Sequence, residues 1–491
     1  MSAVAISAEY SKTLRHIAIS VAIFAGIQLL LPPVNGLTEM GVTLLAIFIA
    51  TVYLWIFVAV DWPSLLAPAL IVAFGIVPHG QMLQFSMGNL PVAYVFATSL
   101  LTVALERTGA IRQAALWFMT RKICEGRPWV FLGMFLFSAT FLEFWVDIVP
   151  LVLIYLALSD EVCQRLGYEK GSKFGQAIVF GILVLTVISY GATPIASPGP
   201  LIMLGFFEDA GFPVTFGQYM AVGIPFTMVV FVFVMLILRF VVNPDMSNFN
   251  NFDIEELRRE MKPLDLEGKI TVTVFILVIV AWLMPDITRF FAPRVSAYFS
   301  MLFLVPPALF GIVLLSIIRV KDDKPILNIK TDIAKTPLGV IVFIVGVQTF
   351  ANTINSPDAG IRDFMSNSLM PLADAITPAM FIWVAMAITV LITQTFSNIV
   401  LQSIMWFAFL PVMTALNVDG VVVNIVAFGI LISLACNIAF VLPPSQVCAP
   451  MCFGSGYLEV SQGIKYGVPT MIGIYILLML VAWPLALWVA G

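Results

Sequence analysis

Long apolar runs separated by short polar stretches dominate the chain from residue 17 to residue 490. A helix needs about 20 mainly apolar residues to cross the hydrocarbon core of a bilayer. Runs near this length predict about eleven transmembrane helices, at residues 17–34, 39–59, 64–78, 92–105, 175–204, 217–240, 270–285, 296–318, 338–353, 420–453 and 467–490. The pattern therefore predicts an all-α polytopic membrane protein.

Two further apolar stretches, 129–157 and 376–412, carry polar residues near their middles. These residues are Glu143 and Asp147 in the first stretch, and Thr393, Gln394, Ser397 and Asn398 in the second. Irregular backbone is tolerated at membrane depth only where it is buried in protein or lines an aqueous cavity. We therefore expect two re-entrant hairpins, each of which enters and leaves the membrane on one side.

The distribution of basic residues supports this threading. With the N-terminus in the cytoplasm, 21 of the 24 lysines and arginines fall on the cytoplasmic side, and only Arg289, Arg294 and Arg362 fall outside. Cytoplasmic loops carry an excess of Lys and Arg in membrane proteins. We expect an inner-membrane protein with a cytoplasmic N-terminus and a periplasmic C-terminus.

Composition excludes several functional classes. Hydrophobic residues make up 61% of the 491 residues and charged residues 11%, with a net charge of −4. A soluble enzyme or a nucleic-acid-binding protein could not cover its surface with so few polar groups. The chain has no nucleotide-binding loop, and its five cysteines have no zinc spacing. We therefore expect neither ATP-driven transport nor enzymatic catalysis, and we read the cysteines as small buried residues.

The two hairpins occupy matching places in the chain. Each precedes an apolar segment that is broken by prolines, TPIASPGP (193–200) after the first and LPPSQVCAP (442–450) after the second. The first hairpin starts inside and the second outside, which is the order of an inverted-topology repeat with its ligand site at the broken helices. The predicted parts are N-terminal helices (1–105), first-repeat elements with the first hairpin and broken helix (106–240), a cytoplasmic linker (241–269), second-repeat helices (270–335) and second-repeat elements with the second hairpin, the second broken helix and the last helix (336–491).

Several residues at these places could carry chemistry. An ionisable side chain at membrane depth is costly, so Asp147, and with it Glu143, is a candidate for ion coupling. The alternative is that Asp147 pairs with Lys122 or Arg127. The cluster around Asn398 offers neutral oxygens and amides, which suit Na⁺ or a carboxylate; hydrogen bonds between helices are the alternative.

At these residues the chain resembles the divalent anion/sodium symporter family of the ion-transporter superfamily. The resemblance rests on ALERTGAIRQAA (104–115), TPLGVIVFIVGVQTFANTI (336–354) and CFGSGYLEVSQGIKYGVP (452–469). The family's Ser-Asn-Thr motif is similar to Ser397-Asn398-Ile399 at the second hairpin, whereas the first hairpin has Asp147-Ile148-Val149 in its place. The resemblance implies an elevator-type carrier and a homodimer. In such a carrier the transport elements, here 106–240 and 336–491, move against the scaffold helices, here 1–105 and 270–335.

The resemblance also implies a set of site residues. One sodium site would carry over to Thr393, Thr395, Asn398 and Ser445, and the other to Asp147 and Ala196. The substrate contacts would fall on Ser397, Asn398, Ser197, Pro198 and Gln446. We expect no cofactor beyond Na⁺ as a coupling ion, and the expected partners are a small anionic substrate and the lipid bilayer.

The predicted function is secondary-active transport of small anions, most simply di- or tricarboxylates, by symport with Na⁺ or H⁺. Anion exchange without a coupling cation is the alternative. A passive anion channel and a membrane-embedded enzyme are less favoured. The sequence leaves the substrate and the coupling ion open.

Overall fold

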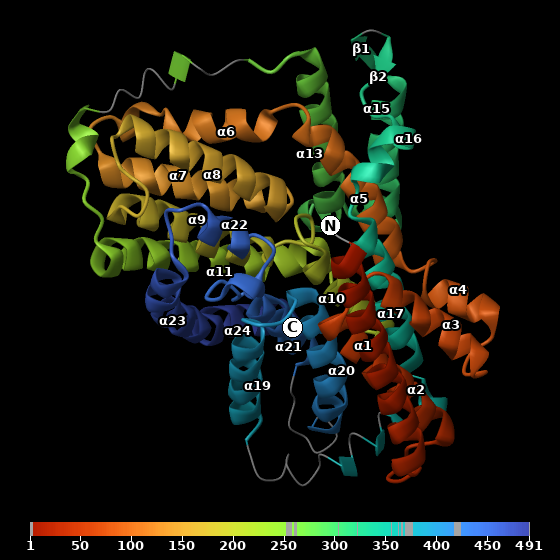
Figure 1. The fold of residues 1–491 in the computed structure, drawn as a ribbon. Helices are drawn as coiled ribbons and strands as arrows, with labels where there is room; N and C mark the ends of the chain where they lie inside the picture. The colour runs from red at the N-terminus through yellow and green to blue at the C-terminus, as the bar shows by residue number, and fades with distance from the viewer. Residues whose placement is uncertain are drawn as a thin grey trace.

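Helices make up nearly all of the regular structure, and a two-stranded sheet is the exception in the described part of the chain (Figure 1). The computed structural model describes residues 3–251, 258–259, 263–302, 304–321, 323–354, 356–361, 363–364, 367–368, 377–416 and 424–490. All five cysteines are buried and free, as the sequence predicts.

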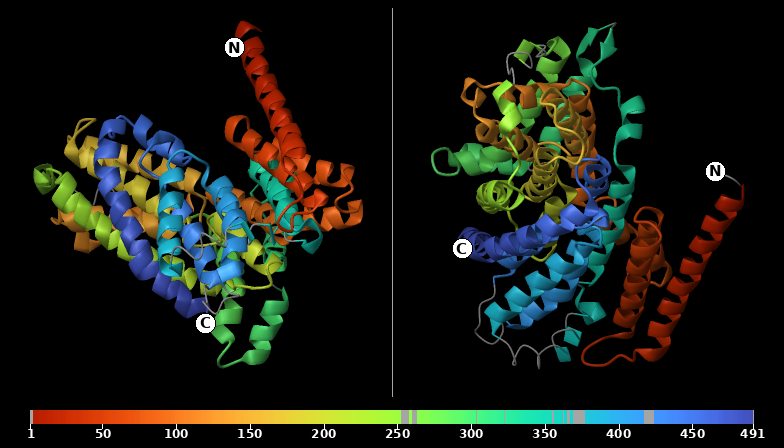
Figure 2. Two further views of the ribbon diagram at one scale, coloured as in Figure 1. Left: turned by 90° about the horizontal axis from the view of Figure 1, so that it is seen from below. Right: turned by 60° about the vertical axis from the view of Figure 1, so that its left-hand side comes forward.

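The N-terminal helices form one side of the molecule. In chain order they are α1 (Ala3–Leu30), α2 (Glu39–Phe57), α3 (Leu66–Ala73), α4 (His79–Phe85) and α5 (Leu90–Glu106). Helix α1 packs along α2 and stands apart from the other helices (Figure 2). Its span from Tyr10 to Leu30 is apolar and contains hardly any fully buried residue, so this surface is suited to lipid.

The first repeat contains the first hairpin and the first broken helix. Its helices are α6 (Ala110–Met119), α7 (Pro128–Glu143), α8 (Ile148–Arg165), α9 (Lys173–Tyr190), α10 (Pro198–Asp209) and α11 (Phe216–Ile237). Proline at the start of α7 and of α10 and a capping box at the start of α11 set three of these boundaries.

A connecting section follows. It comprises α13 (Leu266–Thr288), α14 (Pro293–Leu302), α15 (Val305–Ile317), the antiparallel pair β1 (Arg319–Lys321) and β2 (Lys324–Pro325), and α16 (Ile329–Asp332). Part of the predicted cytoplasmic linker 241–269 lies outside the described residues, since 252–257 and 260–262 are not included.

The second repeat follows the order of the first. Its helices are α17 (Leu338–Ile354), α19 (Pro378–Ile392), α20 (Asn398–Leu416), α21 (Ile425–Cys436), α22 (Ala449–Gly454), α23 (Val460–Leu477) and α24 (Trp483–Ala490). The hairpin α19–α20 corresponds to α7–α8, and the broken helix α21–α22 corresponds to α9–α10. Both predicted hairpins are thus helix–turn–helix units.

The short half-helix of each repeat packs against helices of the other repeat. Helix α10 of the first repeat packs against α20 and α21 of the second, and α22 of the second packs against α8 and α9 of the first. Helices α9 and α21 are buried along nearly their whole lengths. Because the chain is apolar on every side of these two helices, they form the centre of the molecule and bring both breaks into its interior.

Two predicted spans differ from the structure. Residues 64–78 do not form one span, because the helix Trp62–Ala73 ends before Gly75, which has φ +70°. Twelve residues rise only about 18 Å, short of the roughly 30 Å hydrocarbon core. Residues 296–318 do not form one straight span either: α14 and α15 meet at a bend of 73°, with prolines in the first turn of α15.

The described residues contain six helices that are long and apolar enough to cross a membrane, or up to nine if each bent pair counts as one. The predicted number of about eleven spans therefore stays a prediction. Two pairs of segments that the predicted topology places on the same side of the membrane contact each other. Thr38 donates hydrogen bonds to the carbonyls of Asp358 and Ala359, and Arg107 pairs with Asp332 at 3.0 Å.

Candidate functional site

The tip of the first hairpin is held by its own cap and by the first helix break. Asp147 is the N-cap of α8, where its Oδ1 accepts a hydrogen bond from the backbone N–H of Val149 at 3.0 Å. Thr193, within the break, donates its hydroxyl to the carbonyl of Phe144 at 2.6 Å. The hairpin tip and the break are therefore fixed to each other.

The tip of the second hairpin is tied to its own break in the same way. Thr393 donates its hydroxyl to the carbonyl of Cys436 at 2.7 Å and also contacts Oδ1 of Asn398 at 3.1 Å. Gln394 donates to the carbonyl of Ile438 and accepts from the N–H of Val441 at 3.1 Å. A broken helix leaves backbone groups without helical partners, and these side chains provide partners for several of them.

The two breaks lie against each other at Gly191 and Asn437. Helix α9 ends at Tyr190 and α21 ends at Cys436, several residues before the proline-rich segments that we expect to end them. A Cβ atom added at Gly191 would lie 2.7 Å from Cβ of Asn437. The hydroxyl of Tyr219 donates to the carbonyl of Gly191 at 3.0 Å and contacts Ser433 Oγ at 2.8 Å.

Replacement of Gly191 by alanine should therefore destabilise the protein. The added methyl group needs space that Asn437 fills, and overpacking of this kind costs about 1–3 kcal/mol. Thermal unfolding of the purified protein would measure the effect. Gly454→Ala is the control, because a Cβ atom there meets nothing within 4 Å. Equal melting temperatures for the two variants would contradict the packing described above.

A further contact joins the two repeats. Gln402 of α20 donates its amide to the carbonyl of Gly199 in α10 at 2.7 Å. Asn398, at the start of α20, donates to Oδ1 of Asn437 at 3.4 Å, and Asn437 in turn donates to the carbonyl of Ser433 at 2.8 Å. Amide side chains of the second hairpin thus bind both breaks, Gln402 the first and Asn398 the second.

A cavity of about 520 Å³ lies where these elements meet. Its polar lining comes from both hairpins and both broken helices, and consists of Asp147, Tyr190, Ser197, Ser397, Asn398, Gln402, Asn437, Ser445 and Gln446. Asp147 is the one charged side chain among the described lining residues, and neither lysine nor arginine is among them. The cavity can therefore offer hydroxyls, amides and one carboxylate to a ligand.

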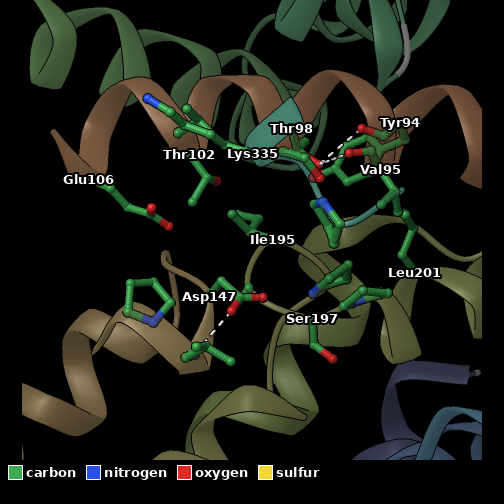
Figure 3. A pocket seen from close by; sticks show the side chains of 18 of the residues that line it. Tyr94, Val95, Thr98, Thr102, Glu106, Asp147, Ile195, Ser197, Leu201 and Lys335 are labelled. Carbon is green, nitrogen blue, oxygen red and sulfur yellow. Dashed lines mark hydrogen bonds between the residues drawn. The ribbon is translucent and has the colours of Figure 1, made fainter. Parts of the chain in front are cut away.

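A second cavity, of about 450 Å³, opens on the other side of Asp147. Thr98, Thr102 and Glu106 of α5 face Asp147 and Ser197 across it, and Lys335 also lines it (Figure 3). Asp147 and Ser197 line both cavities. These two residues therefore stand at the junction between them.

The structure brings together six of the ten site residues that the resemblance implies. The six that line the first cavity are Asp147, Ser197, Ser397, Asn398, Ser445 and Gln446. Ala196 and Pro198 line the second cavity instead. Thr393 is buried behind the first cavity, and Thr395 is exposed, with its hydroxyl bonded to the carbonyl of Ile392 at 3.2 Å.

Oxygen is the ligand atom that hard cations prefer. The second hairpin supplies it from Asn398, and the second break supplies it from Asn437 and the carbonyl of Cys436. Within the described ranges, no group of three or more His, Cys, Asp or Glu side chains is placed to hold a metal ion. This donor set suits a weakly bound, transported Na⁺ better than a resident transition metal.

The sequence analysis missed Asn437 and Tyr190. Tyr190 ends the buried helix α9 and Asn437 directly follows the buried helix α21, each just before a break, at ISYG and at LACN. A polar residue that ends an apolar run before a proline-rich segment is the signal that would have identified them.

Comparisons with known proteins identify the family of the chain. The sequence profile of the sodium:sulfate symporter transmembrane region matches residues 11–489. The sodium-dependent dicarboxylate transporter SdcS of Staphylococcus saprophyticus is 25% identical over 457 residues, which cover 90% of this chain and 85% of that protein. SdcS of Staphylococcus aureus strain USA300 is 24% identical over 442 residues, which cover 87% and 82%.

A solved structure shares the fold. The YdaH transporter of Alcanivorax borkumensis, whose crystal structure was described as having an unusual topology, superposes with a TM-score of 0.56. The likeness covers 86% of this chain and 89% of that one at 14% identity. The profile match spans nearly the whole chain, so this protein belongs to the divalent anion/sodium symporter family, the family of the sodium:sulfate symporters, and is a membrane transporter and not an enzyme.

Proposed function

We propose that this protein is a secondary-active symporter that moves small di- or tricarboxylates together with a cation, Na⁺ or H⁺. The observation that carries the proposal is the charge of the first cavity. Its described lining contains one carboxylate, Asp147, and no lysine or arginine. An anion site without a basic side chain needs another source of positive charge.

Part of that charge comes from helix N-termini. Helices α8, α10 and α20 begin at Ile148, Pro198 and Asn398, beside the cavity. Each N-terminus carries a partial positive charge, and broken helices use it to bind anionic substrates. Because Asp147 adds a negative charge, these partial charges do not balance a dianion. A cation that binds with the substrate would complete the balance, and this links the two fluxes.

The substrate class follows from size and from the relatives. Small-molecule sites have volumes of about 300–1,000 Å³, and the cavity of about 520 Å³ lies within that range. Two relatives are named as sodium-dependent dicarboxylate transporters. A di- or tricarboxylate fits both facts.

The moving part is proposed to be the two hairpins with the two broken helices. They would travel as one body against the N-terminal and connecting helices, as an elevator, in a homodimer of the inner membrane. The hydrogen bonds from Thr193 to Phe144 and from Gln402 to Gly199 support movement as one body, because they bind the hairpins to the breaks.

Uptake into vesicles made with the purified protein tests the function. Labelled succinate and citrate are the probes, under an inward Na⁺ gradient, an inward proton gradient, or neither. We expect saturable accumulation that requires a cation gradient. Accumulation that needs only unlabelled anion inside the vesicles would overturn symport in favour of exchange.

Exchange is the second candidate because of Ala196. The resemblance places Ala196 with Asp147 in one sodium site, and Ala196 has no side-chain oxygen to offer a cation. If the cation site is weakened, the carrier would return to its starting conformation only with a second anion bound, and the net result would be anion exchange.

The proposed orientation predicts which positions react from outside. In a background without the five cysteines, single cysteines at Glu208 and Asp358 should react with an impermeant thiol reagent added to intact cells. Cysteines at Glu169 and Lys330 should react only after the membrane is opened. All four side chains are exposed, so access and not burial decides the result. Labelling of Lys330 in intact cells would overturn the orientation.

A further inference from the structure

Glu143, the last residue of α7, is a buried acid without a partner. Its exposure is 0%, and neither carboxyl oxygen has a hydrogen-bond partner among the described residues. Asp332 offers a comparison within the same chain. It is 1% exposed, but it pairs with Arg107 at 3.0 Å and with Lys335 at 3.6 Å. The chain thus neutralises one buried acid with basic side chains and leaves the other without them.

The titratable groups close to Glu143 supply no positive charge. Those that interact with it electrostatically are Asp147 at the hairpin tip, Tyr155 of α8, Tyr190 of α9 and Cys448 before α22. All four are neutral or negative groups. Tyr155 is already engaged, with its hydroxyl 2.6 Å from Ser138 Oγ.

The basic residues of the neighbouring elements are engaged or distant. Arg112 of α6 pairs with Glu161 at 3.2 Å. Arg239, which follows α11, lies over the ring of Trp129 near the start of α7. Lys122 precedes that start, and α7 rises about 22 Å from there to Glu143. Lys173 begins α9, at the end away from Tyr190. None of these cations is placed to balance an ionised Glu143.

An ionised carboxylate that is buried without a partner is strongly unfavourable, and such a group takes up a proton instead. We propose that Glu143 is a proton-binding site of the transport cycle, neutral in the conformation described here and ionised once movement of the carrier opens the cavities beside Asp147 to water, so that the proton can leave through Asp147. The carboxylate gains a proton on one side of the membrane and returns it on the other. This inference rests on the proposed function and makes H⁺ one of the coupling ions.

Asp147 is a polar group through which a proton can pass between Glu143 and the cavities. It lies four residues after Glu143, and it lines both cavities, across from Glu106 in the second one (Figure 3). The alternative is a fixed role, in which Glu143 stays neutral throughout the cycle and only fills space.

The first test needs no substrate. The infrared carbonyl stretch of a buried, protonated carboxyl group should be present in the full-length protein at neutral pH and should disappear reversibly as the pH is raised. The band should be absent from Glu143→Gln, an isosteric neutral variant. It should persist in the control Glu169→Gln, which changes an exposed glutamate. A missing band, or one that never titrates, would overturn the proposal.

The second test is transport in vesicles without Na⁺. A gradient of one pH unit is worth a factor of about ten for each proton carried. The unmodified protein and Glu169→Gln should accumulate labelled succinate about tenfold by this gradient, whereas Glu143→Gln should not accumulate it. The variant should still exchange external for internal succinate. Accumulation by Glu143→Gln equal to that of the unmodified protein would overturn the proposal. Should the unmodified protein move neither succinate nor citrate under any gradient, the proposed function fails, and the infrared titration alone decides the proton site.

Discussion

Replacement of Asn398 by alanine should abolish uptake while the protein stays folded. Asn398 begins α20, lines the first cavity and joins the second hairpin to the second break through Asn437. Its Oδ1 also accepts from Thr393. Each buried hydrogen bond left unmade costs about 1–3 kcal/mol, and 1.4 kcal/mol is a factor of about ten. Loss of these contacts and of the proposed contact with the substrate should lower uptake by at least about 100-fold.

The measurement is initial uptake of labelled succinate, with size-exclusion chromatography and thermal unfolding to verify folding. Gln164→Ala is the control: it removes an exposed amide from α8 that is bonded to Asp160 and lines neither cavity. Uptake by the control should stay normal. Normal uptake by Asn398→Ala would remove the second hairpin tip from the binding site.

The two hairpins could be predicted from the sequence because polar residues at membrane depth are costly. Asp147 and the cluster from Thr393 to Asn398 interrupt stretches that are otherwise long enough to cross the membrane. Such residues require a special environment, and the structure provides it, because the hairpin tips pack on the helix breaks and line a cavity. The order hairpin, broken helix, helix could likewise be predicted, since it repeats along the chain.

The ends of the broken helices could not be predicted. Prolines suggest breaks near 193 and 442, yet α9 ends at Tyr190 and α21 ends at Cys436. The reason is tertiary: Thr193 bonds to the carbonyl of Phe144, and Thr393 bonds to the carbonyl of Cys436. Contacts between residues more than 40 positions apart leave no local pattern in one sequence.

Some of the site residues that the family resemblance implies do not line the first cavity. Thr395 lies two residues from Ser397, but it faces away from the cavity and is exposed. Ala196 and Pro198 line the second cavity, although their neighbour Ser197 lines both. A motif gives the place of a turn in the chain, whereas the direction of each side chain depends on the backbone angles of that turn. Asn437 and Tyr190 line the first cavity because of the backbone direction at the two breaks, which a motif does not give.

Replacement of Asp147 by asparagine should separate coupling from binding. Asp147 caps α8, and asparagine is about as good an N-cap as aspartate, so the hairpin tip should keep its shape. The substitution removes the only charged side chain from the described lining of the first cavity. A neutral side chain binds a cation poorly and cannot release a proton. We therefore expect the variant to lose cation-driven accumulation of succinate and to keep exchange.

Transport driven by a Na⁺ gradient and transport driven by a proton gradient together identify the ion that Asp147 would bind. If Asp147 binds Na⁺, the unmodified protein accumulates succinate under a Na⁺ gradient with little dependence on pH, and Asp147→Asn loses that accumulation. If Asp147 carries a proton, accumulation rises as the external pH falls and persists without Na⁺, and Asp147→Asn loses that instead. Asp147→Ala separates charge from capping, because alanine also removes the cap, at a cost of about 1 kcal/mol in stability. If Asp147 has only a structural role, Asp147→Asn should accumulate succinate normally and Asp147→Ala should only be less stable. These two results together would contradict a coupling site at the first hairpin. Because Asp147 stands where the two cavities meet, we expect a change in its charge to affect both the binding of the substrate and the coupling to the ion.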